Sequence, residues 1–559
     1  MRLRLLGSAL AAMAVFATPA HANVPGTLSQ VGCILDVVRT SDECAAARGL
    51  RDTAYMAISP DGRFLYAPGR GSDAIAILHA NPVTGLLSQD AGPAGCVGGG
   101  TDAPADCAPV AGLDRPSGIA MTADGGSVFV ASVNGGTLTV FARNATTGAL
   151  TPSGCFQEAG AHAPVAGCTP VVGLGGAVGV AVTPDGRSVY VASETANTIV
   201  MFARDPGSGG LTPTGCLADR AIYDTATCTQ VGSLKGIRSL AASPDSASLY
   251  AAAPGSNAVV AFARGPDGGL TKVGCLSGDD GAGQDATCAP ATALGYAQQV
   301  AVSPDGRFVY VNATDSAAIV AFVRDAASSA LTQVPPPGGC RSDFDNGPGT
   351  CEAAPGMAQS LGIAMTPDGR FLYTGSFTYG SVVSFTRDPQ SGLLAPLGRC
   401  ISAGDPRCVP GTGLERAGYV ALSPNSRFLY ANSTSGPGIA VFARQFDIQR
   451  AKVTAKRARA RRGKLKVPLA CPAGFLEGCF GTVRLAIVKV RGGLKVTNVA
   501  GPARFDLAPG ARAKVTLKLR KKAIRRLRLR RRFAARAIAV SRDGSGATAT
   551  SERTMRLRR

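Results

Sequence analysis

The stretch Ser303-Pro304-Asp305-Gly306-Arg307-Phe308-Val309-Tyr310 joins a turn to a short apolar run that favours a β-strand. Variants of this phrase occur seven times, with Ser or Thr first and Tyr or Phe last. The copies begin at Ser59, Thr122, Thr183, Ser243, Ser303, Thr366 and Ser423. A unit recurring every 60 residues or so is too small to bury its apolar face alone, so it must stack on its neighbours.

Each repeat contains four short apolar runs separated by Gly, Pro and Asp. In the fifth repeat these runs cover 298–302, 308–311, 318–323 and 330–334. Short β-branched runs joined by tight turns are typical of antiparallel hairpins, and no helical periodicity appears before the C-terminal region. Seven units of four antiparallel strands predict an all-β fold, a seven-bladed β-propeller, with only short, protected sheet edges.

The two ends of the repeat array are complementary. Six repeats end in a segment like Gly210–Cys216, but the seventh stops after Arg444, while a matching segment occurs at Gly26–Cys33. We therefore expect the N-terminal strand to complete the last blade.

The first residues and the cysteines indicate an extracellular location. Residues 1–22 combine Arg2 and Arg4 with an apolar run and end in Ala20-His21-Ala22, the pattern of a secretory signal peptide. Sixteen cysteines occur as local pairs, an even count that favours disulfides in a secreted chain over a metal site. The predicted pairs are Cys33–Cys44, Cys96–Cys107, Cys155–Cys168, Cys216–Cys228, Cys275–Cys288, Cys340–Cys351, Cys400–Cys408 and Cys471–Cys479. We expect a secreted or cell-envelope-associated monomer.

The charge divides the chain into two parts. Residues 451–559 contain 31 Lys and Arg against four acidic residues, which leaves 58 − 31 = 27 basic and 37 − 4 = 33 acidic residues elsewhere. The predicted domains are a signal peptide (1–22), the propeller (23–448), a basic linker (449–463) and a basic β-sandwich (464–559). Alternating runs around Cys471, Cys479 and 513–517 suggest an immunoglobulin-like sandwich, with a short basic helix near 523–532.

The basic region has two interpretations. Such a charge density predicts binding to a polyanion, weakening as salt rises; outside a cell this means an anionic cell-surface polymer or carbohydrate. The alternative is a solvated surface of a chain rich in Arg. No nucleic-acid reading motif is present, so no specific nucleic acid is expected.

The phrases Phe308-Val309-Tyr310-Val311-Asn312 and Val189-Tyr190-Val191-Ala192-Ser193, each following Pro-Asp-Gly-Arg, resemble the YVTN/lactonase propeller family over residues 24–446. That family includes enzymes similar to 6-phosphogluconolactonase and carboxymuconate cycloisomerase, so the resemblance implies a seven-bladed fold and possible lactone hydrolysis. The family's His positions are occupied here by Tyr55, Gly118, Gly179, Ser239, Gln299, Gly362 and Tyr419. Its acidic position after the second strand is matched by Glu194, the catalytic candidate.

Polar residues recur where inner strands are predicted to begin, and on a propeller these positions converge on one mouth. The ligand-binding candidates are Arg51, Arg115, Lys235, Arg238, Gln299, Gln359 and Arg416. Several cations among amides suit a small carboxylate or phosphate ligand, although ion pairs between blades are the alternative role. We expect a binding module without cofactor or metal; the alternative is an extracellular lactonase that uses Glu194, and the sequence does not decide whether the chain is an enzyme.

Overall fold

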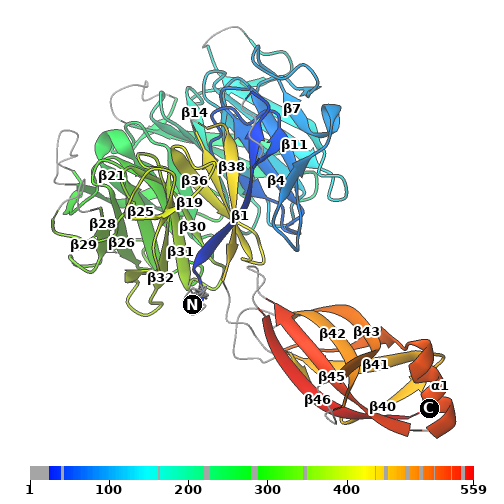
Figure 1. Cartoon of the computed structure of the whole chain (residues 1–559). Helices are drawn as coiled ribbons and strands as arrows, with labels where there is room; N and C mark the ends of the chain where they lie inside the picture. Colours follow the sequence, from blue (N-terminus) through cyan, green and yellow to red (C-terminus); the bar gives the residue numbers. More distant parts are fainter. Residues whose placement is uncertain are drawn as a thin grey trace, which may run out of the picture.

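The computed structural model describes residues 24–38, 43–160, 164–219, 227–278, 287–343, 349–434, 436–445, 451–471, 479–489, 495–508, 510–530, 532–542 and 548–558. The predicted signal peptide lies outside this range. Seven sheets, each holding one copy of the repeated phrase, form the N-terminal part, and an eighth sheet forms the C-terminal part (Figure 1). The predicted all-β, seven-bladed propeller is confirmed.

The blades have the following strands. Blade 1 contains β3 (Ala57–Ile58), β4 (Phe64–Gly69), β5 (Ala74–Ala80), β6 (Leu87–Gln89), β7 (Cys96–Gly98) and β8 (Ala108–Pro109). Blade 2 contains β9 (Pro116–Met121), β10 (Ser127–Ser132), β11 (Thr137–Arg143), β12 (Leu150–Glu158) and β13 (Thr169–Val171). Blade 3 contains β14 (Ala177–Val182), β15 (Ser188–Ser193), β16 (Thr198–Arg204), β17 (Leu211–Ala218) and β18 (Thr229–Gln230). Blade 4 contains β19 (Ser239–Ala242), β20 (Ser248–Ala253), β21 (Ala258–Arg264), β22 (Leu270–Gly278) and β23 (Ala289–Ala291).

The remaining blades follow the same order. Blade 5 contains β24 (Ala297–Val302), β25 (Phe308–Ala313), β26 (Ala318–Arg324), β27 (Leu331–Gln333), β28 (Cys340–Ser342) and β29 (Glu352–Ala353). Blade 6 contains β30 (Ser360–Met365), β31 (Phe371–Ser376), β32 (Ser381–Arg387), β33 (Leu394–Pro396), β34 (Ile401–Ser402) and β35 (Val409–Pro410). Blade 7 contains β36 (Ala417–Leu422), β37 (Phe428–Ser433) and β38 (Gly438–Arg444), together with β1 (Leu28–Asp36) and β2 (Ala45–Ala47). Short 3-10 turns lie at Gly92–Ala94 and Pro254–Ser256.

The inner strands form a ring. Strand β9 contacts β14, and the contacts continue through β19, β24, β30 and β36 to β3, which returns to β9. The seven blades therefore form a closed disc and not an open solenoid.

The blades differ from the four-stranded prediction by one additional strand at the outer edge. In blade 3, β18 pairs parallel with β17, and the other blades have equivalent short parallel strands. A disulfide joins the outer strand to the segment leading into this extra strand, as Cys216–Cys228 does in blade 3. All eight predicted disulfides are confirmed.

Strand β1 lies in the sheet of blade 7, beside β38 (Figure 1). It pairs antiparallel with β38 from Leu28↔Arg444 to Leu35↔Gly438. The hydroxyl of Tyr373 in blade 6 donates to the carbonyl of Gly26 at 2.8 Å. In other blades the equivalent tyrosine bonds a hairpin of the next blade, as Tyr310 does with Gly392, so the N-terminal segment stands where a fourth-strand hairpin would be.

The repeated phrase forms its turn through its own side chains. The hydroxyl of Ser303 donates to Asp305 at 2.5 Å and accepts the backbone N–H of Phe308 at 3.0 Å. Gly306 has φ +68°, a left-handed conformation that glycine adopts without steric cost. The phrase recurs because each blade needs the same tight turn between its first two strands.

Buried arginines connect neighbouring blades. Arg387, at the end of β32, donates to the hydroxyl of Tyr310 at 2.8 Å and to the carboxylate of Asp305 at 2.8 Å, both in the preceding blade. Arg143, Arg264 and Arg324 make equivalent contacts at three further seams. The seam between blades 7 and 1 differs, because Ala80 stands at the arginine position and Asn425 at the aspartate position.

The C-terminal sheet contains β39 (Lys452–Val453), β40 (Arg457–Arg461), β41 (Lys464–Ala470), β42 (Cys479–Lys489), β43 (Lys495–Leu507), β44 (Arg512–Lys518), β45 (Arg532–Arg542) and β46 (Thr548–Arg558). The predicted linker at 449–463 needs correction, because β39 and β40 belong to this sheet. The predicted basic helix is confirmed as α1 (Lys521–Arg530).

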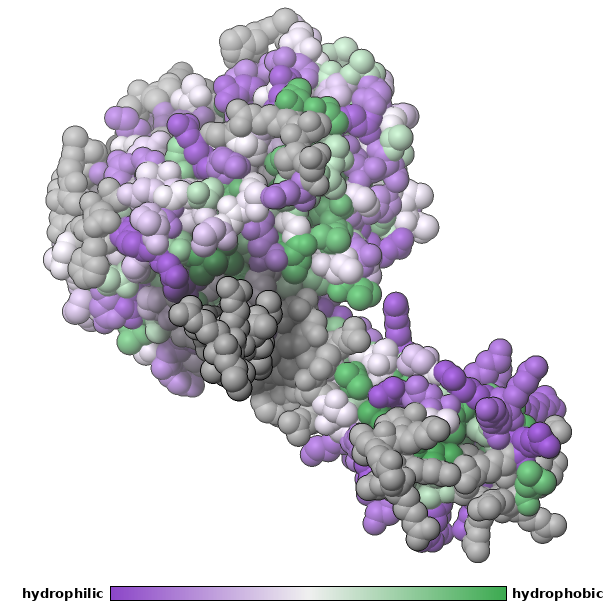
Figure 2. Space-filling view, in the orientation of Figure 1, coloured by the Kyte–Doolittle hydropathy of each residue, from purple (hydrophilic) through white to green (hydrophobic). Residues whose placement is uncertain are grey.

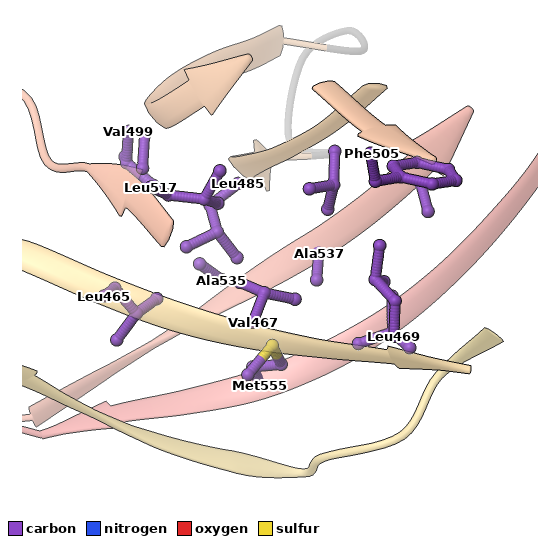
Figure 3. Packing of buried hydrophobic residues seen from close by; sticks show 14 of the residues in the cluster. Leu465, Val467, Leu469, Leu485, Val499, Phe505, Leu517, Ala535, Ala537 and Met555 are labelled. Atoms are coloured by element: carbon purple, nitrogen blue, oxygen red, sulfur yellow. The ribbon is translucent and has the colours of Figure 1, made fainter. Parts of the chain in front are cut away.

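The C-terminal strands share one apolar core. Leu465, Val467, Leu485, Phe505 and Met555 pack together inside it (Figure 3). The strands are hydrogen-bonded into one continuous sheet, and a bridge between Ala500 and Leu519 connects its two ends. The immunoglobulin-like arrangement, with two separate sheets, stays a prediction. Within the described residues, no helix has the length and apolar character to cross a membrane.

Candidate functional site

In all seven blades, a residue in the left-handed conformation lies shortly before the inner strand. These residues are Asp52, Arg115, Gly176, Gly236, Tyr296, Gln359 and Arg416, with φ between +51° and +73°. Five of them are not glycine, and a non-glycine residue at positive φ is uncommon and costs about 1–3 kcal/mol in sparsely populated regions. Such backbone strain concentrates at binding sites, so this ring marks the mouth of the propeller as the candidate site.

Polar side chains of the preceding blade hold several of these positions. The carboxylate of Asp73 accepts the backbone N–H of Arg115 at 2.9 Å, and the amide oxygen of Asn257 accepts that of Tyr296 at 2.8 Å. Asp73 and Asn257 are themselves left-handed, with φ +43° and +45°. The strained strand starts are therefore fixed by neighbouring blades before any ligand arrives.

Side chains from distant blades meet on the propeller axis. The rings of Tyr55 (blade 1) and Tyr419 (blade 7) lie 4.3 Å apart. The amide of Gln298, from blade 5, donates to the Tyr419 hydroxyl at 3.1 Å, and the Tyr55 hydroxyl lies 3.5 Å from the carbonyl of Arg238, before blade 4. Since blades 4 and 5 approach blades 7 and 1 only at the axis, these residues form a floor across the central channel.

An ion pair lies beside this floor. The guanidinium Nε of Arg238 is 2.8 Å from the carboxylate of Glu194, and both side chains are partly exposed. The same guanidinium lies 5.8 Å from the ring centroid of Tyr296. The sequence named Glu194 and Arg238 separately, and the fold brings them together.

The pKa values at this site follow from these contacts. Burial, the largest single effect, would lower the pKa of Arg238, but the Glu194 carboxylate together with Tyr296, Tyr419 and Tyr55 outweighs it and raises that pKa above its usual value. Burial, followed by the nearby Tyr419, raises the pKa of Tyr55 well above its ordinary range. Both groups therefore keep their neutral-pH charge states: Arg238 is cationic and Tyr55 is a neutral phenol.

Three of the other predicted ligand residues already contact other groups of the protein. Gln299 is used inside the fold, because its amide oxygen accepts the backbone N–H of Ile363 at 2.5 Å. Arg51 lies 3.5 Å from Asp102, and the amide oxygen of Gln359 accepts the hydroxyl of Thr378 at 3.0 Å.

Three predicted cations remain without a carboxylate partner in the described part of the chain. Arg115, Lys235 and Arg416 are exposed, and the guanidinium of Arg416 lies 5.0 Å from the ring centroid of Phe377. The alternative of ion pairing between blades therefore does not account for these three side chains.

A cavity of about 1150 Å³ is lined by loops of blades 1 to 3, among them Asp114 and Gly176 at the rim of the mouth. Its carboxylates Asp73 and Glu158 are buried and accept backbone N–H groups, Glu158 from Gly175 at 2.7 Å. Those two carboxylates therefore hold the loops of the fold.

The described residues contain one close group of potential metal ligands, Cys96, Asp106 and Cys107. The two sulfurs form a disulfide, so neither can act as a thiolate ligand. This group is part of the blade scaffold.

Sequence reasoning missed Tyr296 and the role of the two tyrosines as a floor. Tyr296 occupies the same place in its repeat as Asp52, Arg115, Gln359 and Arg416, so alignment of the repeats could have found it. The contact between Tyr55 and Tyr419 could not be found in this way, because it depends on closure of the ring.

No protein-family model matches the chain, and no curated protein matches it in sequence. Similar solved structures include a putative 6-phosphogluconolactonase from Bacteroides fragilis NCTC 9343, with 19% identity over 66% of this chain and 88% of that chain and a TM-score of 0.45. The periplasmic gluconolactonase PpgL of Pseudomonas aeruginosa shows 16% identity over 80% of this chain and 95% of that chain, with a TM-score of 0.45. A putative 6-phosphogluconolactonase from Bacteroides uniformis ATCC 8492 shows 16% identity over 83% of this chain and 100% of that chain, with a TM-score of 0.41. These similarities are too weak to indicate activity, so the functional argument rests on the site.

Proposed function

We propose that this protein is a secreted binding module, whose propeller mouth takes a small anionic ligand and whose basic C-terminal domain attaches to an anionic surface. The observation that carries the proposal for the mouth is a set of exposed cations that have no carboxylate partner among the described residues: Arg115, Lys235 and Arg416. Guanidinium and ammonium groups bind carboxylate and phosphate oxygens by charge-assisted hydrogen bonds.

The floor of the mouth supports the same proposal. The rings of Tyr55 and Tyr419 pack against each other at the axis, and Arg238 lies beside them in its pair with Glu194. An apolar ring face bordered by charged groups suits a small organic acid, such as a sugar acid, because the ring packs against carbon and the cations hold its oxygens.

The test is titration calorimetry of the purified chain with gluconate and 6-phosphogluconate. We expect binding that Arg115→Gln and Arg416→Gln each weaken about ten- to a hundredfold, since one lost charge-assisted hydrogen bond is worth about 1.5–3 kcal/mol. Arg63→Gln, at a turn of blade 1 away from the mouth, is the matched control. If all three variants bind the ligand with equal affinity, the ligand does not bind at the mouth of the propeller.

The second candidate function is lactone hydrolysis, favoured by the Glu194–Arg238 pair at the mouth. In that reaction Glu194 would accept a proton from the attacking water, while Arg238 would stabilise the negative charge that forms on the carbonyl oxygen. Turnover of glucono-δ-lactone above the uncatalysed rate, abolished by Glu194→Gln and by Arg238→Ala, would establish the enzyme. If glucono-δ-lactone is hydrolysed at the same rate with and without the protein, the enzyme is excluded and only the binding-module proposal remains.

Secretion is supported by the eight disulfides, because such bonds persist in oxidising compartments. The predicted signal peptide at residues 1–22 would direct this export. We also propose that β1 is the clasp that closes the ring, supported by its pairing with β38 and by the hydrogen bond from Tyr373 to Gly26.

A further inference from the structure

Arg416, one of the exposed cations of the mouth, lies over an aromatic ring. Its guanidinium carbon is 5.0 Å from the ring centroid of Phe377, a half-buried side chain of blade 6. The backbone of Arg416 is left-handed, with φ +53°, and its carbonyl accepts the hydroxyl of Thr434 at 2.9 Å. Because the backbone is fixed and the ring attracts the cation, Arg416 loses less freedom on binding a ligand than an unsupported arginine would.

The contact comes from the seam between blades 6 and 7. Phe377 begins the turn between β31 and β32, and Gly380 ends it. A Cβ at Gly380 would overlap the carbonyl of Leu414, so the turn lies directly against the loop that leads to Arg416. The ring of Phe377 is thereby placed beneath a side chain of the next blade.

A second hydrogen-bond donor lies beside Phe377. The amide oxygen of the exposed Gln359 accepts the hydroxyl of Thr378 at 3.0 Å, which leaves the NH2 group of that amide for another acceptor. The backbone carbonyl of Gln359 accepts the N–H of Phe377 at 3.1 Å, so both residues belong to one corner of the mouth. Among the described residues, neither this NH2 group nor the guanidinium of Arg416 has a hydrogen-bond partner. We call Gln359, Phe377, Thr378 and Arg416 the seam subsite.

Glu415, the neighbour of Arg416 in the sequence, is directed elsewhere. Its carboxylate lies against Gly436, in the turn between β37 and β38, and it has no ion pair with a described residue. Arg416 therefore gives the seam subsite one positive charge that is not paired within the described part of the chain.

We propose that the seam subsite binds the carboxylate group of the ligand, with Phe377 as the residue that positions Arg416. This inference rests on the proposed binding of a small anion at the mouth, and it names the acid group and the residues that hold it. A guanidinium presents a planar fork of donors that matches the two oxygens of a carboxylate, and the amide of Gln359 donates to a remaining lone pair. A phosphate monoester carries about −1.5 to −2 charges at pH 7, more than one cation neutralises, so it fits the subsite less well.

The experiment is titration calorimetry of the full chain with gluconate, sorbitol 6-phosphate and sorbitol, which share a polyol chain and differ in the acid group. The C-terminal domain projects many hydrophilic side chains (Figure 2) and holds 31 of the 58 Lys and Arg residues, so it attracts any small anion. All titrations are therefore made at one salt concentration, and the propeller variants are compared with one another.

Arg416→Lys keeps the charge and removes the planar fork, so we expect it to weaken gluconate binding about tenfold. The matched control is Arg115→Lys, because Arg115 is exposed at the equivalent place of blade 2, has φ +52°, and has no aromatic partner among the described residues. The control should change the affinity less than about threefold. Phe377→Leu should weaken gluconate binding about threefold, and Phe377→Tyr should keep wild-type affinity, because a phenol ring also attracts a guanidinium. An unchanged melting temperature shows that each variant is folded.

The other two ligands test the choice of acid group. Sorbitol should bind at least about tenfold more weakly than gluconate, and the affinity for sorbitol 6-phosphate should change less than about threefold in Arg416→Lys. Equal losses of gluconate binding in Arg416→Lys and Arg115→Lys would overturn the seam subsite and leave anion binding at the mouth intact. A loss of sorbitol 6-phosphate binding as large as that of gluconate would overturn the carboxylate, and equal losses in Phe377→Leu and Phe377→Tyr would overturn the positioning role. If the wild type does not bind gluconate, both this inference and the proposed binding at the mouth are wrong.

Discussion

The propeller and the C-terminal sheet use arginine in opposite ways. In the propeller, Arg387 is fully buried and its donors reach Tyr310 and Asp305 of the neighbouring blade. In the C-terminal sheet, Arg556 is exposed and lies beside Arg457. Arg387 stabilises the propeller because its donors are hydrogen-bonded to groups of the neighbouring blade. Arg556 weakens the C-terminal sheet, because its charge repels the charge of Arg457 on the adjacent strand. The buried arginines at the blade seams, such as Arg387, therefore serve the fold. Binding of a partner by the exposed C-terminal arginines is our proposal.

The largest effect is expected from removing β1, the strand that we propose closes the ring. Deletion of residues 24–36 exposes the edge of β38 and removes the Gly26 carbonyl that Tyr373 bonds. We expect the propeller to lose cooperative unfolding in a calorimetric scan and to melt about 10 °C or more below the wild type.

A milder variant keeps the strand and removes only its disulfide. Cys33→Ser/Cys44→Ser should cost about 2–3 kcal/mol in the free energy of unfolding, because the closed loop is short. If the deletion variant and Cys33→Ser/Cys44→Ser both unfold in the same thermal transition as the wild type, β1 contributes nothing to closure of the ring.

The next effect compares a buried with an exposed arginine. Arg387→Ala leaves Asp305 and the buried Tyr310 without their donor, so we expect a loss of about 3 kcal/mol in urea unfolding. Arg556→Ala should stay within about 0.5 kcal/mol of the wild type. Comparable losses would contradict the assignment of the two roles.

The smallest effect is a difference in alkaline stability. Burial raises the pKa of Tyr310 to about 12, although the Arg387 charge and its hydrogen bond act against it. In the unfolded chain the phenol ionises near its ordinary pKa of 10, so this contribution to stability is complete below pH 10 and is lost as the pH rises to about 12.

The measurement is the free energy of unfolding of Tyr310→Phe at pH 9 and pH 11. The variant cannot ionise at this position, so it should lose about 1 kcal/mol less than the wild type over that interval, one pKa unit corresponding to about 1.4 kcal/mol. Tyr66→Phe, at a seam with the same contacts, tests whether the effect is general. If the free energy of unfolding falls equally with pH in the wild type and in both variants, ionisation of other groups causes the loss of stability at alkaline pH.

The repeated phrase was sufficient to predict the propeller because its information is local. Ser303, Asp305 and Gly306 form their turn with one another, and the disulfides join cysteines at most 13 residues apart. The helix near 523–532 and the charge of the C-terminal region could also be predicted, because both depend on residues close together in the sequence. The predicted linker was wrong because Arg457–Arg461 pairs with Arg556–Arg558 at the far end of the domain, and alternation with alanine gives a weak strand signal.

The sequence by itself determined the number of blades, their turns and their disulfides, since each depends on residues close together in the chain. Only the tertiary structure decided that Tyr55 meets Tyr419, that Glu194 pairs with Arg238, and that Arg457 lies beside Arg556. These contacts join segments separated by tens to hundreds of residues, and their geometry is fixed by ring closure and strand register, which no local pattern of residues encodes.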